Sequence, residues 1–322
     1  MYDNNMAFGI VGLGKMGGNL ALQALEKGMR VVGLTRGEPP AELAKNGLIN
    51  AGSAEGFRQH LDAPRMVFMY IPAGAAVDGL IDDLSGALET GDIIVDGGNS
   101  YWGDSIRRYR RCREKGIQFV DLGTSGGVDG ARNGACFMAG GDDSAIAPLA
   151  PILKALAVDD GYVHAGPPGA GHFVKLVHNG IEFGMLQAIG EGMDLLENYR
   201  DQLNVADILT CWRNGSVIRS WLIDLMDEIY RKEGGLENVP AFVEDTGEVN
   251  WLVDDAMKME VPVHVIAQSV MQLFASRDDK KSWARAIAMM RHGFGGHPYG
   301  PDAGIRKERR RGRIGGFVAE DE

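Results

Sequence analysis

The feature that most constrains this chain is a glycine-rich turn, GLGKMG, which directly follows a short apolar strand, Ala7–Val11. A helical pattern follows the turn, and a second apolar strand, Arg30–Leu34, follows the helix. In such a unit the first glycine permits a tight turn, the second lets a pyrophosphate approach the backbone, and the third lets the helix pack on the strand. We therefore predict a dinucleotide-binding fold whose cofactor is held by Gly12, Leu13, Gly14, Lys15, Met16 and Gly17.

The end of the second strand bears on the choice between NAD and NADP. An Asp or Glu at this place would hold the ribose hydroxyls of NAD, whereas an arginine accommodates the 2′-phosphate of NADP. The chain reads Leu34-Thr35-Arg36-Gly37 here, and Glu38 lies past the turn. Thr35 and Arg36 are therefore predicted to contact the cofactor, and NADP is favoured over NAD. The alternative is that Arg36 only covers the adenine face, which either cofactor permits.

The remaining pattern predicts an α/β Rossmann-type N-terminal domain with a parallel-rich sheet, followed by an all-α C-terminal domain. Strand-length apolar runs alternate with helical patterns up to about residue 165, with a long glycine-rich loop after the strand IQFVDLG. The later periodicity is helical, at 171–199, 205–232, 248–259, 262–276 and 279–291. We predict a dinucleotide-binding domain over 1–165, a helical substrate and dimerisation domain over 166–301, and a basic tail over 302–322.

Composition excludes several classes of protein. A net charge of −11 over 322 residues argues against a nucleic-acid or acidic-membrane binder. The three cysteines are too scattered for a disulfide framework or a zinc motif, and no apolar run is long enough to span a membrane. The start of the chain lacks the basic region of a signal peptide. We expect a cytoplasmic enzyme without a bound metal. The basic run 305–313 is interpreted as a solvated terminus, with nucleic-acid contact as the alternative.

One predicted helix, in the stretch GHFVKLVHNGIEFG, carries three polar groups on one side. At about 100° per residue, Asn179 lies roughly 40° around from Lys175, and Glu182 roughly 20° away. Lys175 and Glu182 are separated by about 10 Å along the axis. An amine, an amide and a carboxyl on one stripe of a helix that we expect to be largely buried indicate a chemical role. The alternative is a structural pairing of lysine and glutamate, although a spacing of seven is not that of the usual surface pair.

Taken together, these stretches resemble the decarboxylating 6-phosphogluconate dehydrogenases, and specifically their short form of about 300 residues. The matching segments follow one another along the chain as GLGKMGGNL, DGGNS, GTSGGVDGARNG, GAGHFVKLVHNGIE, WRNGSVIRSWL and FGGH. The chain is more distantly similar to β-hydroxyacid dehydrogenases, which share the architecture and the lysine but not the phosphosugar-binding residues. The resemblance implies oxidation of 6-phosphogluconate at C3 by NAD(P), followed by loss of CO₂ to give ribulose 5-phosphate.

The resemblance also implies the roles of the polar stripe. Lys175 would act in its neutral form as the general base on the 3-hydroxyl, and would then polarise the 3-keto group. Glu182 would deliver a proton to C1 of the resulting enediol, and Asn179 would orient the reacting oxygens. His178 would bond substrate hydroxyls, although a histidine packed in the core is the alternative.

Other residues are assigned by the same resemblance. Asn99, Ser125, Gly126 and Gly127 would contact the substrate's carboxylate end and the nicotinamide; the cofactor would also contact Ile71, Ala73 and Asn99. The phosphate would be bound by Arg219 together with Arg291 and His297, the last two from a neighbouring subunit. This implies a homo-oligomer, dimer or tetramer. For Arg219 the alternative is a merely solvated arginine.

The chain departs from the family pattern in places. Phe183 stands where the family commonly has a tyrosine that contacts the phosphate, and PAFVEDTGEVNW lacks a lysine that the long form places there. Two other functions therefore stay open. One is a β-hydroxyacid dehydrogenase acting on a smaller, unphosphorylated acid, and the other is a non-catalytic NAD(P)-binding protein.

Overall fold

The computed structural model describes residues 6–199 and 201–306, and its contacts divide the chain into two units. The first, which we call the α/β unit, contains the chain up to Gly180 together with Gly247–Glu260. The second, the helical unit, contains Ile181–Thr246 and the described residues from Val261 onward. The domain limits predicted from the sequence, 165/166 and 301/302, stay a prediction. Most of the basic run 305–313 lies outside the described residues.

The α/β unit is built on one sheet, to which the described residues contribute eight strands in the order β3-β2-β1-β4-β5-β6-β7-β8. Strands β1 to β6 run parallel, and β7 is antiparallel to β6. The order changes direction between β1 and β4, which is where doubly wound sheets bind ligands at their carboxyl ends. The Rossmann-type, parallel-rich prediction is therefore confirmed. The strands are β1 (Ala7–Val11), β2 (Arg30–Leu34), β3 (Ile49–Asn50), β4 (Met66–Met69), β5 (Ile93–Asp96), β6 (Gln118–Ser125), β7 (Ala135–Gly140) and β8 (Ala157–Gly166).

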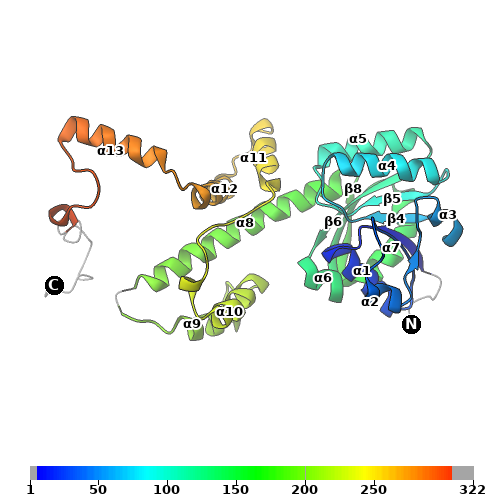
Figure 1. Cartoon of the computed structure of the whole chain (residues 1–322), viewed down its shortest axis with the longest axis horizontal. Helices are drawn as coiled ribbons and strands as arrows, with labels where there is room; N and C mark the ends of the chain where they lie inside the picture. The colour runs from blue at the N-terminus through cyan, green and yellow to red at the C-terminus, as the bar shows by residue number, and fades with distance from the viewer. Residues whose placement is uncertain (1–5, 200, 307–322) are drawn as a thin grey trace. The chain divides into compact units, whose positions relative to one another are not determined.

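Helices cover both faces of this sheet, because successive strand side chains point to opposite sides. Phe8 and Ile10 pack with α1 (Lys15–Glu26), α6 (Gly127–Asn133) and α7 (Asp143–Leu156). On the other face, Val67 and Met69 pack with α3 (Gly56–His60), α4 (Ala75–Ala87) and α5 (Trp102–Glu114). Figure 1 shows α4 and α5 on one side of the sheet and α1, α6 and α7 on the other. The short helix α2 (Ala41–Lys45) follows β2.

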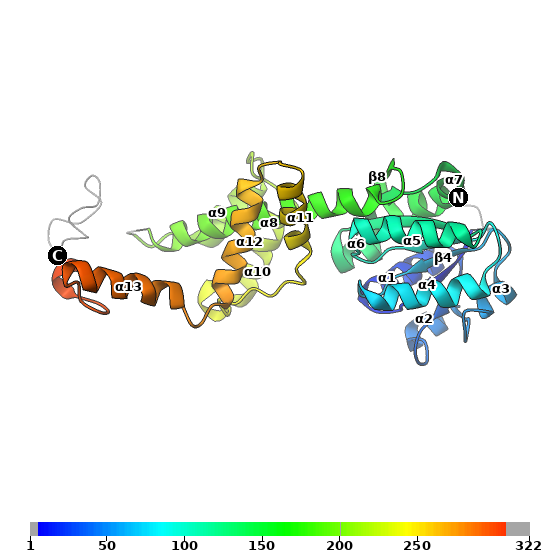
Figure 2. The same cartoon turned by 90° about the horizontal axis from the view of Figure 1, so that it is seen from above.

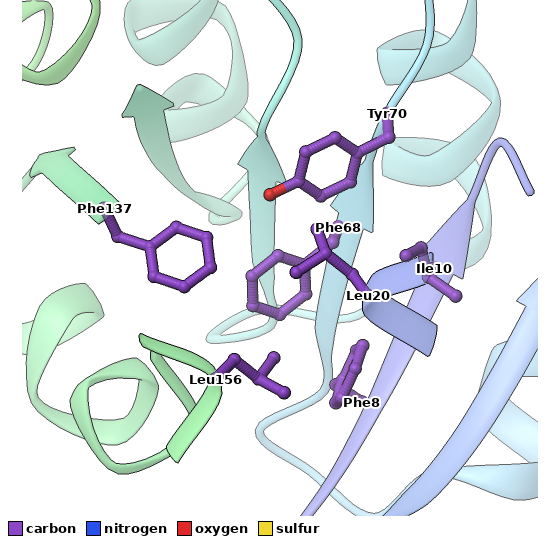
Figure 3. A pocket seen from close by; sticks show the side chains of 7 residues that line it. All are labelled: Phe8, Ile10, Leu20, Phe68, Tyr70, Phe137 and Leu156. Carbon is purple, nitrogen blue, oxygen red and sulfur yellow. The ribbon is translucent and has the colours of Figure 1, made fainter. Parts of the chain in front are cut away.

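A small cavity lies within the first of these two cores, and Figure 3 shows the side chains around it. The rings of Phe8 and Phe68 meet edge to face at 5.1 Å between centroids. The one polar side chain among those that line the cavity is Tyr70, whose hydroxyl bonds Thr124. We interpret this space as a packing defect of the core. Its lining is Phe8, Ile10, Leu20, Phe68, Tyr70, Phe137 and Leu156.

The helical unit combines the second half of a long helix with several shorter helices. It contains the end of α8 (Ala170–Glu197), then α9 (Val205–Arg213), α10 (Trp221–Glu233), the 3₁₀ turn η1 (Leu236–Asn238), α12 (His264–Arg277) and α13 (Ser282–Gly295). Figure 2 gives a second view of these helices. The intervening helix α11 (Glu248–Lys258) belongs to the α/β unit. Among the described helices, none has both the length and the apolar character needed to cross a membrane.

The structure corrects several sequence-based expectations. The single helix expected over 205–232 is two helices, α9 and α10, because Asn214 and Gly215 end the first one, Gly215 with a φ of +86°. The loop expected after β6 contains the helix α6. This helix was not predicted because its sequence is rich in glycine. Helix α7 carries Pro148 and Pro151 in its interior, a pattern that usually argues against a helix, and it was not predicted.

Candidate active site

The three glycines of the turn after β1 meet the three predicted requirements. Gly12 has a φ of +92°, and a Cβ there would lie 2.3 Å from the carbonyl oxygen of Tyr70. A Cβ on Gly17 would lie 2.0 Å from the carbonyl oxygen of Gly12, so α1 packs directly on the turn. A Cβ on Gly14 would meet nothing within 4 Å. The second glycine therefore borders open space at the amino end of a helix, which suits an anionic pyrophosphate.

An exposed arginine follows the second strand, where the sequence predicts the adenosine of the cofactor. Thr35 and Arg36 directly follow β2, and Arg36 is exposed. In α1, all of which the structure describes, the first turn has no acidic side chain. These residues therefore fit a dinucleotide with or without a 2′-phosphate.

A buried arginine ties together the loops after β4 and β5. The guanidinium of Arg108, which is 0% exposed, donates to Asp96 at 3.3 Å and to the Ser100 hydroxyl at 3.1 Å. It also donates to the carbonyl oxygen of Gly74 and to Asp78, both at 3.1 Å. These loops carry Ile71, Ala73 and Asn99. The network thus fixes the backbone on which three predicted site residues stand.

A second buried carboxylate fixes the beginning of α8. Asp121 of β6 accepts hydrogen bonds from the amides of Gly169 at 2.7 Å and His172 at 2.8 Å. Burial raises the pKa of this carboxyl, although these hydrogen bonds and the charge of His172 oppose the shift. A carboxylate that receives the unpaired amides of a helix's first turn stabilises that end of the helix.

Helix α8 also approaches the sheet closely, at positions where residues with a side chain would collide. A Cβ on Gly123 of β6 would lie 2.6 Å from the Cβ of Lys175. A Cβ on Gly171 would lie 2.4 Å from the carbonyl oxygen of Asp121, and one on Gly140 would lie 2.5 Å from the amide of Gly171. These three glycines therefore set the position of Lys175 against the carboxyl end of β6.

Lys175 belongs to a cluster of polar side chains. His178 Nε2 lies 3.0 Å from the Ser125 hydroxyl, and His178 Nδ1 lies 3.2 Å from Asn179 Oδ1. The amine of Lys175 is 3.5 Å from the same Nδ1. A protonated Nδ1 can donate to Asn179, whereas an unprotonated one can accept from Lys175, so the two contacts depend on the tautomer. The structure therefore brings Lys175, His178, Asn179 and Ser125 together.

The cluster is linked to the glycine turn through the sheet edge. The Tyr70 hydroxyl lies 3.0 Å from the Thr124 hydroxyl, and Thr124 directly precedes Ser125. Burial raises the pKa of Tyr70, so its phenol is a neutral hydrogen-bonding group. Because the backbone of Tyr70 also contacts Gly12, the turn, the end of β4 and the polar cluster form one continuous edge.

The turn from β6 into α6 contains two further predicted residues. Gly126 and Gly127 have φ values of +106° and +59°, which favour glycine at both positions. The turn follows Ser125 directly, so it lies beside the polar cluster. Because glycine has no side chain, the backbone amides of these two residues are suited to contact a crowded reacting centre.

Four predicted site residues belong to the helical unit. Glu182 lies on α8 beyond Gly180 and is half-buried. Arg219 lies between α9 and α10, Arg291 is exposed on α13, and His297 follows α13. The roles of these four residues stay predictions.

The expectation that α8 is largely buried is wrong for part of its surface. Val174 and Ile181 are 37% and 54% exposed, whereas Leu176 and Asn179 are buried. The covered side is the one that packs on β6 and α5, where Phe173 meets Trp102 edge to face. One side of the helix is therefore available for contact with another surface.

The supporting residues of the site were not found from the sequence. They are Tyr70, Arg108, Asp121 and Thr124. A carboxylate inside an apolar strand, as at Asp121, is a usable signal because an isolated buried charge is costly. Arg108 is one of five arginines in its helix, and its sequence neighbours do not distinguish it.

Comparisons with known proteins match both parts of the chain. A family model described as the NAD binding domain of 6-phosphogluconate dehydrogenase matches residues 7–166. A second, the 6-phosphogluconate dehydrogenase C-terminal domain, matches residues 171–300. This chain belongs to the 6-phosphogluconate dehydrogenase family. It is therefore an oxidoreductase of that family with an NAD(P)-binding Rossmann domain.

Two full-length relatives support this membership. The Bacillus subtilis (strain 168) protein YqeC, which carries only a provisional name as a 6-phosphogluconate dehydrogenase, is 40% identical over 91% of this chain and 98% of its own. A Haloferax volcanii protein named as an NAD(+)-dependent, decarboxylating 6-phosphogluconate dehydrogenase is 39% identical over the same shares.

Solved structures agree on the architecture. Plasmodium falciparum 6-phosphogluconate dehydrogenase, solved with NADP+ and with 6-phosphogluconate, superposes with a TM-score of 0.75 at 27% identity. The match covers 92% of this chain and 66% of that one, so this chain spans about two thirds of its length. Mycobacterium tuberculosis 3-hydroxyisobutyrate dehydrogenase shares the fold at 20% identity, with a TM-score of 0.65 over 85% of this chain and 94% of the other.

Proposed function

We propose that this protein oxidises 6-phosphogluconate with NADP or NAD and releases CO₂ to give ribulose 5-phosphate, a step of the pentose phosphate pathway. The observation that carries the proposal is the cluster of Lys175, His178, Asn179 and Ser125 at the sheet edge that also holds the glycine turn. The names of the Haloferax and Plasmodium relatives support the substrate. The three cysteines are unpaired, which suits the reducing cytoplasm expected from the sequence.

In this reaction the bound nicotinamide supplies the acceptor for the hydride that leaves C3. Lys175, in its neutral form, removes the proton of the 3-hydroxyl as the ketone forms. As an ammonium it then donates a hydrogen bond to the 3-keto oxygen, which stabilises the negative charge that develops there when CO₂ departs. His178 can exchange a proton with Lys175 through Nδ1, and Asn179 fixes the orientation of the reacting oxygens. Glu182, in its protonated form, protonates C1 of the enediol.

The cofactor preference is proposed to be NADP. Arg36 is an exposed guanidinium at the end of β2, where a forked donor matches a phosphate. The Haloferax relative is named as NAD(+)-dependent, so the preference differs among the relatives of this chain. Arg36→Ala should raise KM for NADP by about 10-fold, the loss of one charge-assisted pair, and leave KM for NAD within about 2-fold.

The phosphate is proposed to be bound by Arg219 with Arg291 and His297 from a second copy of the chain. Helix α13, which carries Arg291, exposes Trp283, Met289, Met290 and Phe294 by more than 60% each, which supports a homo-oligomer. Subunit mixing tests whether two copies of the chain share one site. When inactive Lys175→Ala and Arg291→Ala proteins are mixed and allowed to exchange, about a quarter of the sites should combine intact residues if the assembly is a symmetric dimer. Activity that does not recover would contradict a shared site.

The deciding experiment is an assay of the purified protein with 6-phosphogluconate, with NADP and NAD in parallel. Reduced nicotinamide and CO₂ should appear in equal amounts, with CO₂ followed from substrate labelled at C1. Oxidation without CO₂ would instead favour a β-hydroxyacid dehydrogenase. Cofactor binding without any turnover would favour a non-catalytic protein.

A further inference from the structure

Asn99, the predicted substrate contact in the loop after β5, is hydrogen-bonded to a residue far along the chain. Its amide Nδ2 donates to Oε1 of Glu248 at 2.7 Å, across a separation of 149 residues. Glu248 is the first residue of α11, which belongs to the α/β unit although it follows much of the helical unit in sequence. A segment from the second half of the chain thus returns to this loop.

Helix α11 is fixed to the chain segment that directly follows Asn99. Asp255 is 3% exposed and accepts from the Tyr101 hydroxyl at 2.8 Å and from Trp102 Nε1 at 2.7 Å. Burial, and then the hydrogen bond to Asp255, raise the pKa of Tyr101 to about 12, so its phenol remains a donor. The ring of Trp251 meets the ring of Tyr101 at 5.6 Å. Glu248 is therefore presented by an anchored helix.

Glu248 stands in the first turn of its helix. It follows Gly247, whose φ of +83° makes the turn into α11. A carboxylate in the first turn of a helix is stabilised by the helix dipole and the unpaired amides. An asparagine amide has two N–H donors and a carbonyl oxygen. With one N–H held by Glu248, the other donor and the oxygen remain for a ligand, in a fixed orientation.

We propose that Glu248 is a positioning residue that orients the amide of Asn99 for the substrate. This inference rests on the proposed function, because Asn99 is assigned there to the substrate and the nicotinamide. Removing the Glu248 carboxylate leaves Asn99 in place but lets its amide rotate. The reaction then loses part of the orientation that the free enzyme provides, and the amide of Asn99 transmits this loss to the substrate.

Kinetics on a double-mutant cycle test this role. Glu248→Ala should lower kcat/KM by about 10-fold or more, the effect of losing a hydrogen bond to a charged group. Glu248→Gln, which keeps an acceptor, should recover most of the loss. In an Asn99→Ala background the Glu248→Ala change should cost less than about 2-fold, because the hydrogen bond between the two side chains is already lost. The control is Asp254→Ala, on the same helix and paired only with Lys258 among the described residues. Independent, multiplying effects of the two changes would overturn the proposal.

A measurement without turnover separates this inference from the proposed reaction. The side-chain amide signal of Asn99 in a ¹⁵N spectrum is identified by its absence in Asn99→Ala. We expect that signal to shift in Glu248→Ala, to return towards its position in Glu248→Gln, and to stay in place in Asp254→Ala. A signal unmoved by Glu248→Ala contradicts the positioning role whatever the substrate is. A wild-type protein that fails to oxidise 6-phosphogluconate contradicts the proposed reaction alone.

Discussion

The α/β unit and the helical unit differ in how well each buries its own apolar surface. The α/β unit has a hydrophobic core on each face of the sheet, and its buried Asp96, Arg108 and Asp121 all have hydrogen-bond partners. Among the described residues of the helical unit, few hydrophobic side chains are buried: Met193, Val205, Leu209, Ile223 and Val270. Extended exposed apolar surface usually marks an interaction site. The first unit therefore buries its own core, whereas the second leaves apolar surface exposed, which supports the proposed homo-oligomer.

The sharpest test of this comparison concerns chemistry that depends on the α/β unit. Lys175→Met should lower kcat by about 10²- to 10⁴-fold, the usual contribution of a general acid–base group. Its melting temperature and its Kd for NADP, measured by calorimetry, should stay at the wild-type values. The matched control is Lys154→Met, an exposed lysine on α7. Turnover within about 10-fold of wild type would refute the base assignment.

The next prediction concerns the charges buried in the α/β unit. Arg108→Met should lower the free energy of unfolding by about 3–5 kcal/mol, because it leaves the buried Asp96 without its cation. Arg110→Met, on the exposed side of the same helix, should cost less than about 0.5 kcal/mol. Urea unfolding of both variants measures the difference. Equal costs would mean that the Arg108 network is not what stabilises the loops after β4 and β5.

The next prediction concerns the association of the helical unit with another copy of the chain. Trp283, which is 63% exposed on α13, should become buried in the oligomer. Trp283→Ser should weaken association by about 2 kcal/mol or more, a typical cost for removing a central tryptophan. Sedimentation over a dilution series measures this effect, and Val158→Ser, an exposed apolar residue of the α/β unit, is the control. A wild-type chain that is monomeric at all concentrations would remove the explanation offered for the exposed α13 surface.

The smallest effect is a pH dependence in the α/β unit. Partial burial alone would raise the pKa of Asp78, but hydrogen bonds from Arg107 and Arg108 and their charges outweigh it and lower the pKa to about 2. A carboxyl whose pKa is lower in the folded state stabilises the fold above its unfolded pKa. That stabilisation should be present above the usual value of 3.8 and disappear as the pH falls towards about 2. The stability difference between wild type and Asp78→Asn should therefore shrink over this interval. A constant difference would contradict the ion pair.

The sequence predicted those parts of the site that depend on local pattern. The glycine turn, the strand ends and the placement of Lys175 and Asn179 on one side of a helix are encoded by spacing over a few residues, whereas His178 was assigned by the family resemblance. Family membership, suggested by the stretches that contain them, was confirmed by the comparisons.

The remaining parts depend on contacts that local spacing does not encode. Glu248 meets Asn99 across 149 residues, and nothing near either residue indicates the other. The break at Asn214 and Gly215 was missed because the apolar period continues on both sides of it. The extent of burial of α8 was overestimated because an apolar side chain, such as Ile181, need not pack within its own unit and can instead serve contact with another surface.

The close approach of α8 to β6 and β7 has a consequence for how this enzyme tolerates change. Gly123, Gly140 and Gly171 carry no functional group, yet an added methyl at any of them would collide with backbone or with the stem of Lys175. A systematic replacement of each residue by alanine should therefore rank these inert positions alongside the reactive ones. Where α8 meets the sheet, the volume of a residue rather than its chemistry decides which substitutions the fold accepts.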